Sequence, residues 1–201
     1  MSHEPNGESL VLLDKLVAAL KRRGVCTEED LVAREESAGR ASPAQGARMV
    51  ARAWMDPDYR ALMIRDGTAA AEGMGIRMTG NPPLGVLADT PALHHLVVCT
   101  LCSCYPRAII GYPPHWYKSA AYRARAVREP RAVLAEFGTV LPASTQVRVV
   151  DSTADYRWMV LPERPTGTEG WSEDRLAAIV TRDHLVGVSL PTAAGSRLGA
   201  A

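Results

Sequence analysis

The apolar residues between Ser9 and Gly75 recur at helical spacing, and this segment shows no alternating pattern typical of a strand. The first apolar run ends before Gly24, a residue type that commonly stops a helix. The residues of that run are Leu10, Leu13, Leu16, Val17 and Leu20. The pattern predicts an amphipathic helical arm, whose apolar face packs either on its own domain or on another chain.

Three further helical segments follow in the same region. Thr27 and Asp30 have the spacing of a capping box and predict a short second helix. Ser42–Met55 begins with a serine cap and a first-turn proline, which predicts a third helix. Tyr59–Met74 is predicted to form one helix or a pair that is broken at Gly67. We therefore expect residues 1–80 to form a helical N-terminal arm.

The pattern changes at the breaker Asn81–Pro83. Leu84–Leu87 and His95–Val98 are short apolar runs typical of strands, and Asp89–Pro91 between them predicts a turn. A cluster of cysteines follows the second run directly. The cluster is therefore expected in a loop, ahead of an apolar segment that ends at Gly111.

The remainder of the chain mixes helical and strand patterns, and its small, polar tail after Pro191 predicts no fixed structure. The predicted helices are Tyr122–Arg128, Pro130–Phe137 and Ser172–Thr181, and the predicted strands are Val147–Asp151, Tyr156–Leu161 and Val186–Leu190. Helices come first and mixed elements later, so residues 81–201 are expected to form a second domain.

Charge and composition exclude some classes of function. The 201-residue chain is 47% apolar with a net charge of +1, so it can bury a core but has no general field for nucleic acid or an anionic membrane. It contains no apolar run of membrane-spanning length, and Met1–Glu8 lacks the features of a signal peptide. These observations predict a cytoplasmic protein that binds neither nucleic acid nor membrane.

Three of the four cysteines lie within six residues, in the spacing Cys99-x2-Cys102-x-Cys104. This cluster cannot close loops as a disulfide scaffold does. Thiolates so close would repel one another unless a cation lay between them, and soft sulfur ligands favour zinc, copper(I) or iron–sulfur, with cobalt(III) or iron(III) as borderline alternatives. The cluster therefore predicts a metal site.

Three interpretations of the cluster compete. A structural zinc ion would need a fourth ligand, and Cys-x-Cys pairs are unusual for zinc. The candidates for that ligand are His94, His95 and Cys26. A redox Cys-x-x-Cys pair leaves Cys104 unexplained. The third interpretation places two sulfurs and the deprotonated amides of Ser103 and Cys104 in a square plane, with the remaining sulfur axial and one position open. That geometry suits a low-spin trivalent ion.

The segment Val97–Pro106, VVCTLCSCYP, resembles the metal-binding claw of nitrile hydratase alpha subunits. The resemblance covers roughly His94 to Leu190. Its other segments are Pro113–Lys118, Tyr122–Arg131, Tyr156–Pro162, Gly167–Ser172, Thr181–Asp183 and Val186–Val188. It implies an α+β fold in which a helical N-terminal arm precedes a layered α-β-β-α domain.

The resemblance also implies the ligands. Cys99, Cys102 and Cys104 would give sulfurs, and Ser103 and Cys104 amide nitrogens, with Cys102 oxidised to sulfinate and Cys104 to sulfenate. Thr100 resembles the cobalt branch, so cobalt(III) is expected and iron(III) is the alternative.

The implied reaction is that of a hydro-lyase, which adds water to a nitrile and yields an amide. The ion acts as a Lewis acid. Cys104 and Ser103 are the expected catalytic residues, and the Cys104 sulfenate oxygen is a candidate nucleophile or base. The implied partners are a beta subunit of one or two chains, which supplies arginines to the oxidised sulfurs, and a metallochaperone or activator.

Other side chains match family positions near the site. Asp151 and Glu169 match acidic ones, although Asp151 could cap a turn and Glu169 could lie in solvent. Tyr105 and Trp116 could line the pocket, but packing in the core is favoured. His94 and His95 should lie on opposite faces of a strand, so both cannot be ligands, and we interpret them as structural.

Two departures from the family pattern bear on the substrate. Arg107 stands where the family usually has tryptophan, and Gly80-Asn81 where it usually has Gln-Gly. Arg107 resembles the thiocyanate hydrolase gamma subunit, which releases carbonyl sulfide and ammonia, and a cation would suit an anionic substrate or pair with a sulfinate. A three-chain nitrile hydratase for a large nucleoside nitrile such as toyocamycin, and a non-enzymatic metal-storage or sensing module, stay open as alternatives.

Overall fold

The computed structural model describes residues 7–32, 42–102 and 104–194. By its internal contacts the chain divides into two units, Met1–Arg40 and Ala41–Ala201. The boundary expected at residue 80 therefore lies inside the second unit. The physical reason is that the helices of residues 43–73 pack on the strand Leu84–Ala88 and on helices near the C-terminus. The tail predicted after Pro191 lies outside the described residues from 195 onward.

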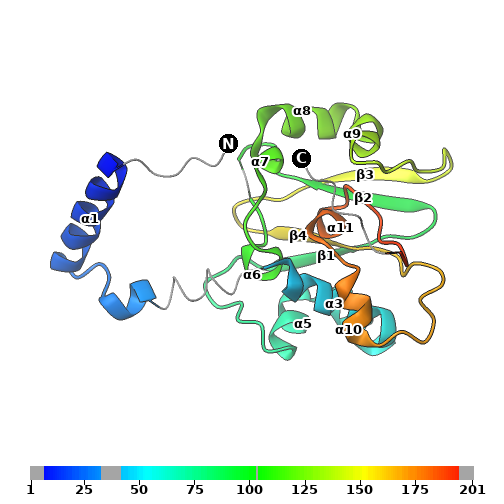
Figure 1. Ribbon diagram of the computed structural model, residues 1–201, viewed down its shortest axis with the longest axis horizontal. Helices are drawn as coiled ribbons and strands as arrows, with labels where there is room; N and C mark the ends of the chain where they lie inside the picture. The colour runs from blue at the N-terminus through cyan, green and yellow to red at the C-terminus, as the bar shows by residue number, and fades with distance from the viewer. Residues whose placement is uncertain (1–6, 33–41, 103, 195–201) are drawn as a thin grey trace. The chain divides into compact units, whose positions relative to one another are not determined.

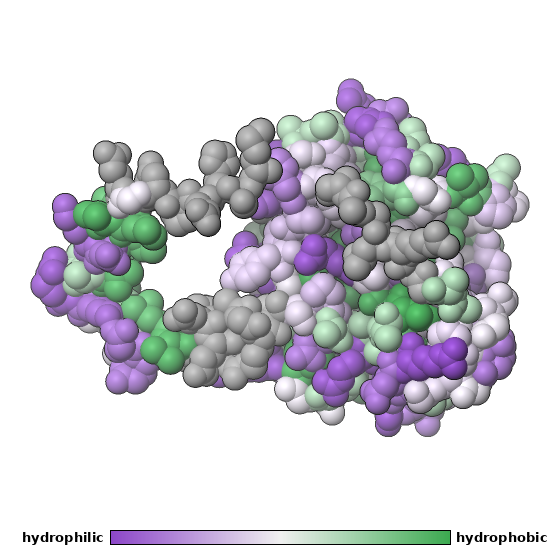
Figure 2. Space-filling view, in the orientation of Figure 1, coloured by the Kyte–Doolittle hydropathy of each residue, from purple (hydrophilic) through white to green (hydrophobic). Residues whose placement is uncertain are grey.

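The first unit contains α1 (Gly7–Arg22), followed by Gly24 at a positive φ of 64° (Figure 1). The predicted capping box is confirmed, because the Asp30 amide donates to Thr27 Oγ1 at 3.1 Å and the Thr27 amide donates to Asp30 Oδ2 at 2.9 Å. Figure 2 shows hydrophobic residues on the surface of this unit beside hydrophilic ones. Those of α1 that are 47–68% exposed are Leu10, Val11, Leu12, Leu13 and Leu16.

The second unit is built on two small parallel sheets. In one, β1 (Leu84–Ala88) pairs with β4 (Arg157–Leu161). In the other, β2 (Leu93–Val98) pairs with β3 (Gln146–Asp151), and Val98 lies opposite Asp151. Strands of a parallel pair that are covered on both faces must be apolar along most of their length, as β2 and β4 are.

Helices cover the outer face of each sheet, which gives four layers (Figure 1). On the β2–β3 side lie α8 (Ala120–Arg128) and α9 (Pro130–Glu136), with the short α7 (His115–Lys118) packed on α8. The short α6 (Arg107–Ile110) packs instead on α3. On the β1–β4 side lie α3 (Pro43–Met55), α4 (Pro57–Arg65), α5 (Gly67–Gly73) and α10 (Glu173–Ala178). The α+β fold with a layered α-β-β-α domain is therefore confirmed.

The predicted pair of helices between Tyr59 and Met74 is also found, with the break at Asp66. The carboxylate of Asp66 accepts a hydrogen bond from the Ala69 amide at 2.9 Å, so Asp66 ends α4 and caps α5. Among the described residues, no helix is both long and apolar enough to cross a membrane.

The strand predicted at Val186–Leu190 is wrong. Residues Arg182–Val186 form a helix, α11, which Gly187 ends in the left-handed conformation at φ 84°. Two features favour the helix, and neither affects the alternating pattern of apolar residues on which the prediction was based. One is the cap at Thr181, whose amide donates to His184 Nδ1 at 2.9 Å, and the other is the glycine that ends the helix. A side chain at Gly187 would lie 2.0 Å from the His95 carbonyl oxygen, so this turn packs directly on β2.

Candidate metal centre

The cysteine cluster lies where β2 ends. Cys99 follows Val98, the last residue of the strand, and the loop then turns back on itself. The Cys99 and Cys102 sulfurs are 3.4 Å apart and those of Cys102 and Cys104 are 3.2 Å apart. All three lie within 4.8 Å of one another, close enough to hold one metal ion. The loop thus brings three sulfurs to one point.

The surroundings of the sulfurs favour a bound cation. Cys99 and Cys104 are buried, whereas Cys102 is exposed. Burial, reinforced by hydrogen bonds with Cys102 and Cys99, raises the pKa of the Cys104 thiol to about 12, while the positive charge of Arg157 acts in the opposite direction. A cation among the sulfurs would replace their mutual repulsion with attraction and stabilise the thiolates. The donor set therefore fits a sulfur-ligated metal ion.

A pocket of about 320 Å³ opens beside the cluster. Two of the cysteines, Cys102 and Cys104, line it. Its other lining residues are Asn81, Pro82, Tyr105, Arg107 and Arg157. The guanidinium of Arg107 also lies 5.5 Å from the centre of the Tyr112 ring. The pocket therefore combines sulfur with two guanidinium groups and an amide.

Arg157 is a residue of the pocket that the sequence interpretation did not single out. It begins β4, which pairs with β1 from Leu84 onward, and Asn81 lies just ahead of that strand. The sequence carried one signal for it, because Arg157 lies within the family-like segment Tyr156–Pro162. The pairing that brings it to the cysteines spans more than seventy residues of sequence and could not be inferred from spacing.

Asp151 contacts the loop that carries the three cysteines. It ends β3 opposite Val98, and its Oδ1 accepts a hydrogen bond from the Thr100 amide at 3.0 Å. Its Oδ2 accepts a second one from the Thr100 hydroxyl. Thr100 lies in the loop between Cys99 and Cys102, so Asp151 reaches the cluster through one intervening residue.

The two aromatic candidates take different positions. Tyr105 is buried, lines the pocket and packs edge-on against Tyr117 with ring centres 4.9 Å apart. Trp116 is not among the residues that line the pocket, and its ring packs on Tyr122 at 4.9 Å and on Phe137 at 4.8 Å. Trp116 therefore packs in the core, as expected. Tyr105 lies between the core and the pocket and contacts both.

The structure does not bring Glu169 to the cysteines. Its Oε1 accepts a hydrogen bond from the Gly167 amide at 3.3 Å in an exposed turn. The predicted ligand and catalytic residue Ser103 lies outside the described residues.

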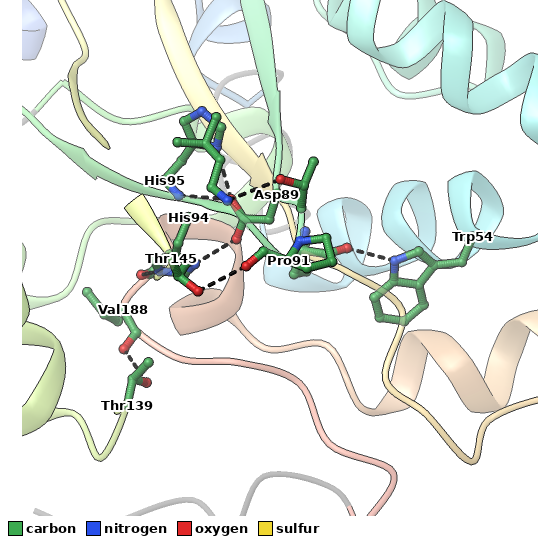
Figure 3. A network of polar contacts seen from close by, with 12 residues as sticks. Trp54, Asp89, Pro91, His94, His95, Thr139, Thr145 and Val188 are labelled. Atoms are coloured by element: carbon green, nitrogen blue, oxygen red, sulfur yellow. Dashed lines mark hydrogen bonds and ion pairs between the residues drawn. The ribbon is translucent and has the colours of Figure 1, made fainter. Parts of the chain in front are cut away.

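His94 and His95 belong to a separate buried network (Figure 3). His94 Nδ1 forms an ion pair with Asp89 Oδ2 at 2.8 Å, and its Nε2 lies 2.7 Å from the Gly187 carbonyl oxygen. His95 Nδ1 lies 2.9 Å from Asp89 Oδ1. Although successive residues of a strand point to opposite faces, Asp89 in the preceding turn reaches both rings. Neither histidine lines the cysteine pocket, in agreement with their structural interpretation.

Comparison with known proteins places these features in a family. Residues 8–189 match the family model for "Nitrile hydratase, alpha chain". The gamma subunit of thiocyanate hydrolase from Thiobacillus thioparus is 49% identical, over 84% of this chain and 74% of that protein. The alpha subunit of the low-molecular-weight cobalt-containing nitrile hydratase from Rhodococcus rhodochrous is 51% identical, over 75% of this chain and 72% of that protein.

Solved structures agree with the sequence relatives. A double histidine mutant of the iron-type nitrile hydratase from Comamonas testosteroni Ni1 matches with a TM-score of 0.85 and 42% identity, over 98% of this chain and 97% of that one. A recombinant thiocyanate hydrolase with partially modified cobalt centres matches with a TM-score of 0.85 and 43% identity, over 98% of each chain.

Proposed function

The chain belongs to the nitrile hydratase alpha-chain family, and from this premise we propose that it is the metal-binding alpha subunit of a nitrile hydratase that uses cobalt(III). The observation that carries the proposal is the convergence of three cysteine sulfurs within 4.8 Å of one another at an open pocket. Several relatives are named as cobalt-containing, and iron(III) is the alternative ion because a structural relative is of the iron type.

The proposed ligands are the sulfurs of Cys99, Cys102 and Cys104 and the amide nitrogens of Ser103 and Cys104. When bound, the ion supplies Lewis-acid polarisation of the nitrile or of water. Hydration forms a bond between the water oxygen and the nitrile carbon and moves both water protons to nitrogen, which gives the amide. The catalytic residues of the proposal are Cys104 and Ser103.

We propose that an external oxidant modifies two of the sulfurs, converting Cys102 to sulfinate and Cys104 to sulfenate. The exposure of Cys102 supports its deeper oxidation, because Cys104 is buried. The sulfenate oxygen of Cys104 would face the pocket, where it can act as nucleophile or as base. Arg107 and Arg157 line the same pocket, and their charges would stabilise the oxidised sulfurs.

The relatives are themselves subunits, of nitrile hydratases and of a thiocyanate hydrolase. We accordingly propose that a beta subunit, as one or two chains in a hetero-oligomer, completes the pocket of this chain and adds arginines, and that a metallochaperone or activator loads the ion. A cytoplasmic location is part of the same proposal, because a reducing compartment keeps closely spaced thiols available for metal.

A second candidate function is that of a thiocyanate hydrolase gamma subunit. The observation that favours it is the cationic wall of the pocket, where Arg107 and Arg157 lie with Asn81. Two guanidinium groups suit an anion better than a neutral nitrile. The 49% identity to such a subunit supports the same candidate.

The decisive experiment is co-expression of the chain with its partner subunits in medium that contains cobalt. The purified complex should contain cobalt, and the mass of its cysteine peptide should show added oxygens on Cys102 and Cys104. It should convert a nitrile to the amide, and it should release no carbonyl sulfide when it is given thiocyanate. Carbonyl sulfide and ammonia from thiocyanate, without amide from nitriles, would select the hydrolase. A complex with neither cobalt nor iron, and with unmodified cysteines, would refute both functions and leave metal storage or sensing.

A further inference from the structure

The backbone of the cysteine loop is held at three carbonyl groups by one neighbouring segment. The Tyr122 hydroxyl donates to the Val97 carbonyl at 2.8 Å, just before the loop begins. Arg123 Nη1 donates to the Thr100 carbonyl at 3.1 Å, in the middle of the loop. The Tyr117 hydroxyl donates to the Cys104 carbonyl at 2.9 Å, where the loop ends. All three donors come from α7 and α8.

Thr100 is the residue at which this segment meets a second support. Its carbonyl accepts from Arg123, while its amide and hydroxyl both donate to Asp151. Asp151 is itself fixed, because it ends β3 and the next amide, that of Ser152, donates to the Val98 carbonyl at 2.7 Å. Thus every polar group of Thr100 is bound, by residues that lie 23 and 51 positions away.

The charges in this arrangement match the polarity of the peptide groups. A carboxylate faces the Thr100 amide, and a guanidinium faces its carbonyl, so both contacts are charge-assisted and stronger than neutral hydrogen bonds. Thr100 directly follows Cys99 and precedes the turn that returns Cys102 to within 3.4 Å of it. Fixing both peptide groups of Thr100 therefore fixes the approach of the two sulfurs, which would repel each other as thiolates.

We propose that Arg123 and Asp151 are positioning residues that hold the cysteine loop closed through Thr100, and so determine how firmly the metal is retained. We call these three residues the Thr100 clamp. The inference rests on the proposed function for its metal, but the clamp itself is made only of this chain's residues. Partners of this kind, which orient ligands without binding the ion, typically change metal affinity or activity by about 10- to 100-fold when they are removed.

The test uses Asp151→Asn and Arg123→Met in the full complex. The asparagine can still accept from the Thr100 amide but carries no charge, and the methionine keeps an apolar stem while it loses the donor. Both variants should release cobalt to a chelator at least about tenfold faster than the wild type. Hydrogen exchange at the amides of Thr100 and Leu101, followed by mass spectrometry on the chain without added cobalt, should also become faster.

Matched controls separate the clamp from general stability. Asp155→Asn changes an exposed carboxylate in the loop after β3, and Arg128→Met changes an exposed arginine at the end of α8. Both controls should retain cobalt like the wild type. If Asp151→Asn or Arg123→Met does not fold by circular dichroism, Thr100→Val removes the hydroxyl contact alone and should still accelerate cobalt release.

The outcomes are distinct. Cobalt release within about twofold of the wild type in both clamp variants, with unchanged exchange at Thr100, would overturn the clamp while leaving the proposed function intact. A wild-type complex that takes up neither cobalt nor iron would overturn the metal function, and the exchange measurement would then decide alone whether Asp151 and Arg123 hold the loop.

Discussion

The two ends of β2 each carry a cluster of side chains, and the two clusters are built in opposite ways. At its start, His94 and His95 share the carboxylate of Asp89, and all three side chains are at most 5% exposed. At its end, three sulfurs of like chemistry converge beside an open pocket. The first cluster balances its charges within the described chain, whereas the second needs a cation from outside.

The contacts of the first cluster define its protonation. Both ring nitrogens of His94 face oxygen atoms that can accept a hydrogen bond, an arrangement that favours the imidazolium form. Burial acts to lower the pKa of His94, but the hydrogen bond and charge of Asp89 raise it overall. Burial acts to raise the pKa of Asp89, but hydrogen bonds from His94 and His95 lower it overall. The result is a buried ion pair that joins β2 to the turn after α11.

This contrast indicates which polar cluster is structural and which is functional. A buried network with its partners inside the chain fixes the fold, while a cluster of like groups that remains accessible is arranged for something that binds. The comparison predicts that a substitution in the cysteine cluster will not disrupt the histidine cluster, and that a substitution in the histidine cluster will not abolish metal binding.

The largest effect is expected from removing a sulfur. Cys104→Ser should reduce the cobalt content of the complex to background and lower nitrile turnover by more than about 100-fold, because loss of a direct ligand exceeds the loss of an outer partner. Metal analysis and a turnover assay measure both. Cys26→Ser, which changes the cysteine of the first unit, is the control and should be silent. Cobalt retained by Cys104→Ser would refute the sulfur ligand set.

The next effect is expected at the other end of the strand. Asp89→Asn leaves the charge of His94 buried without its partner, and breaking such a pair costs about 3–5 kcal/mol of unfolding free energy. Urea denaturation at about pH 6 measures this loss, with the exposed Asp155→Asn as control. Cobalt retention by the folded fraction should be unchanged. A variant that loses cobalt but keeps its stability would contradict the division between the two ends.

The pH dependence of that loss is a smaller effect with a defined sign. The pKa of His94 is raised above 6.5, so its contribution to stability is complete below that value and is lost as the pH rises through the folded-state pKa. The pKa of Asp89 is lowered below 3.8, so its contribution is lost only as the pH falls through that lower value. Both contributions are present between about pH 4 and 6.5.

The destabilisation caused by Asp89→Asn should therefore shrink when denaturation is repeated from about pH 6 to about pH 9. A constant difference over this range would show that His94 is not charged in the folded protein.

The sequence predicted most of the elements because each carries a local signal. Apolar spacing located α1 and β2, and the caps at Thr27 and Ser42 located the starts of two helices. The same patterns missed α11, because alternation over Val186–Leu190 mimics a strand while the deciding contacts are a cap and a glycine turn.

The residues of the candidate site also differ in whether a local sequence signal could reveal them. The three cysteines are neighbours in sequence, so their convergence followed from spacing together with the family resemblance. Arg157 and Arg123 reach the loop only through strand pairing and helix packing over long separations, and a single sequence does not encode those distances locally. Asp151 was proposed from resemblance, and its contact with Thr100 depends on the register of β2 against β3.

The smallest expected effect concerns Arg107 and the substrate that binds in the pocket beside the cysteines. Arg107 is exposed in the pocket wall, so solvent weakens its interaction with an anion, and Arg107→Trp should raise the KM or the inhibition constant for thiocyanate by about tenfold or less. The KM for a neutral nitrile should change less, because no charge pairs with it. Steady-state kinetics with both compounds measure the ratio, and Arg128→Met is the control. Equal changes for the two compounds would show that Arg107 shapes the pocket without selecting charge, and the cationic wall would then no longer favour thiocyanate.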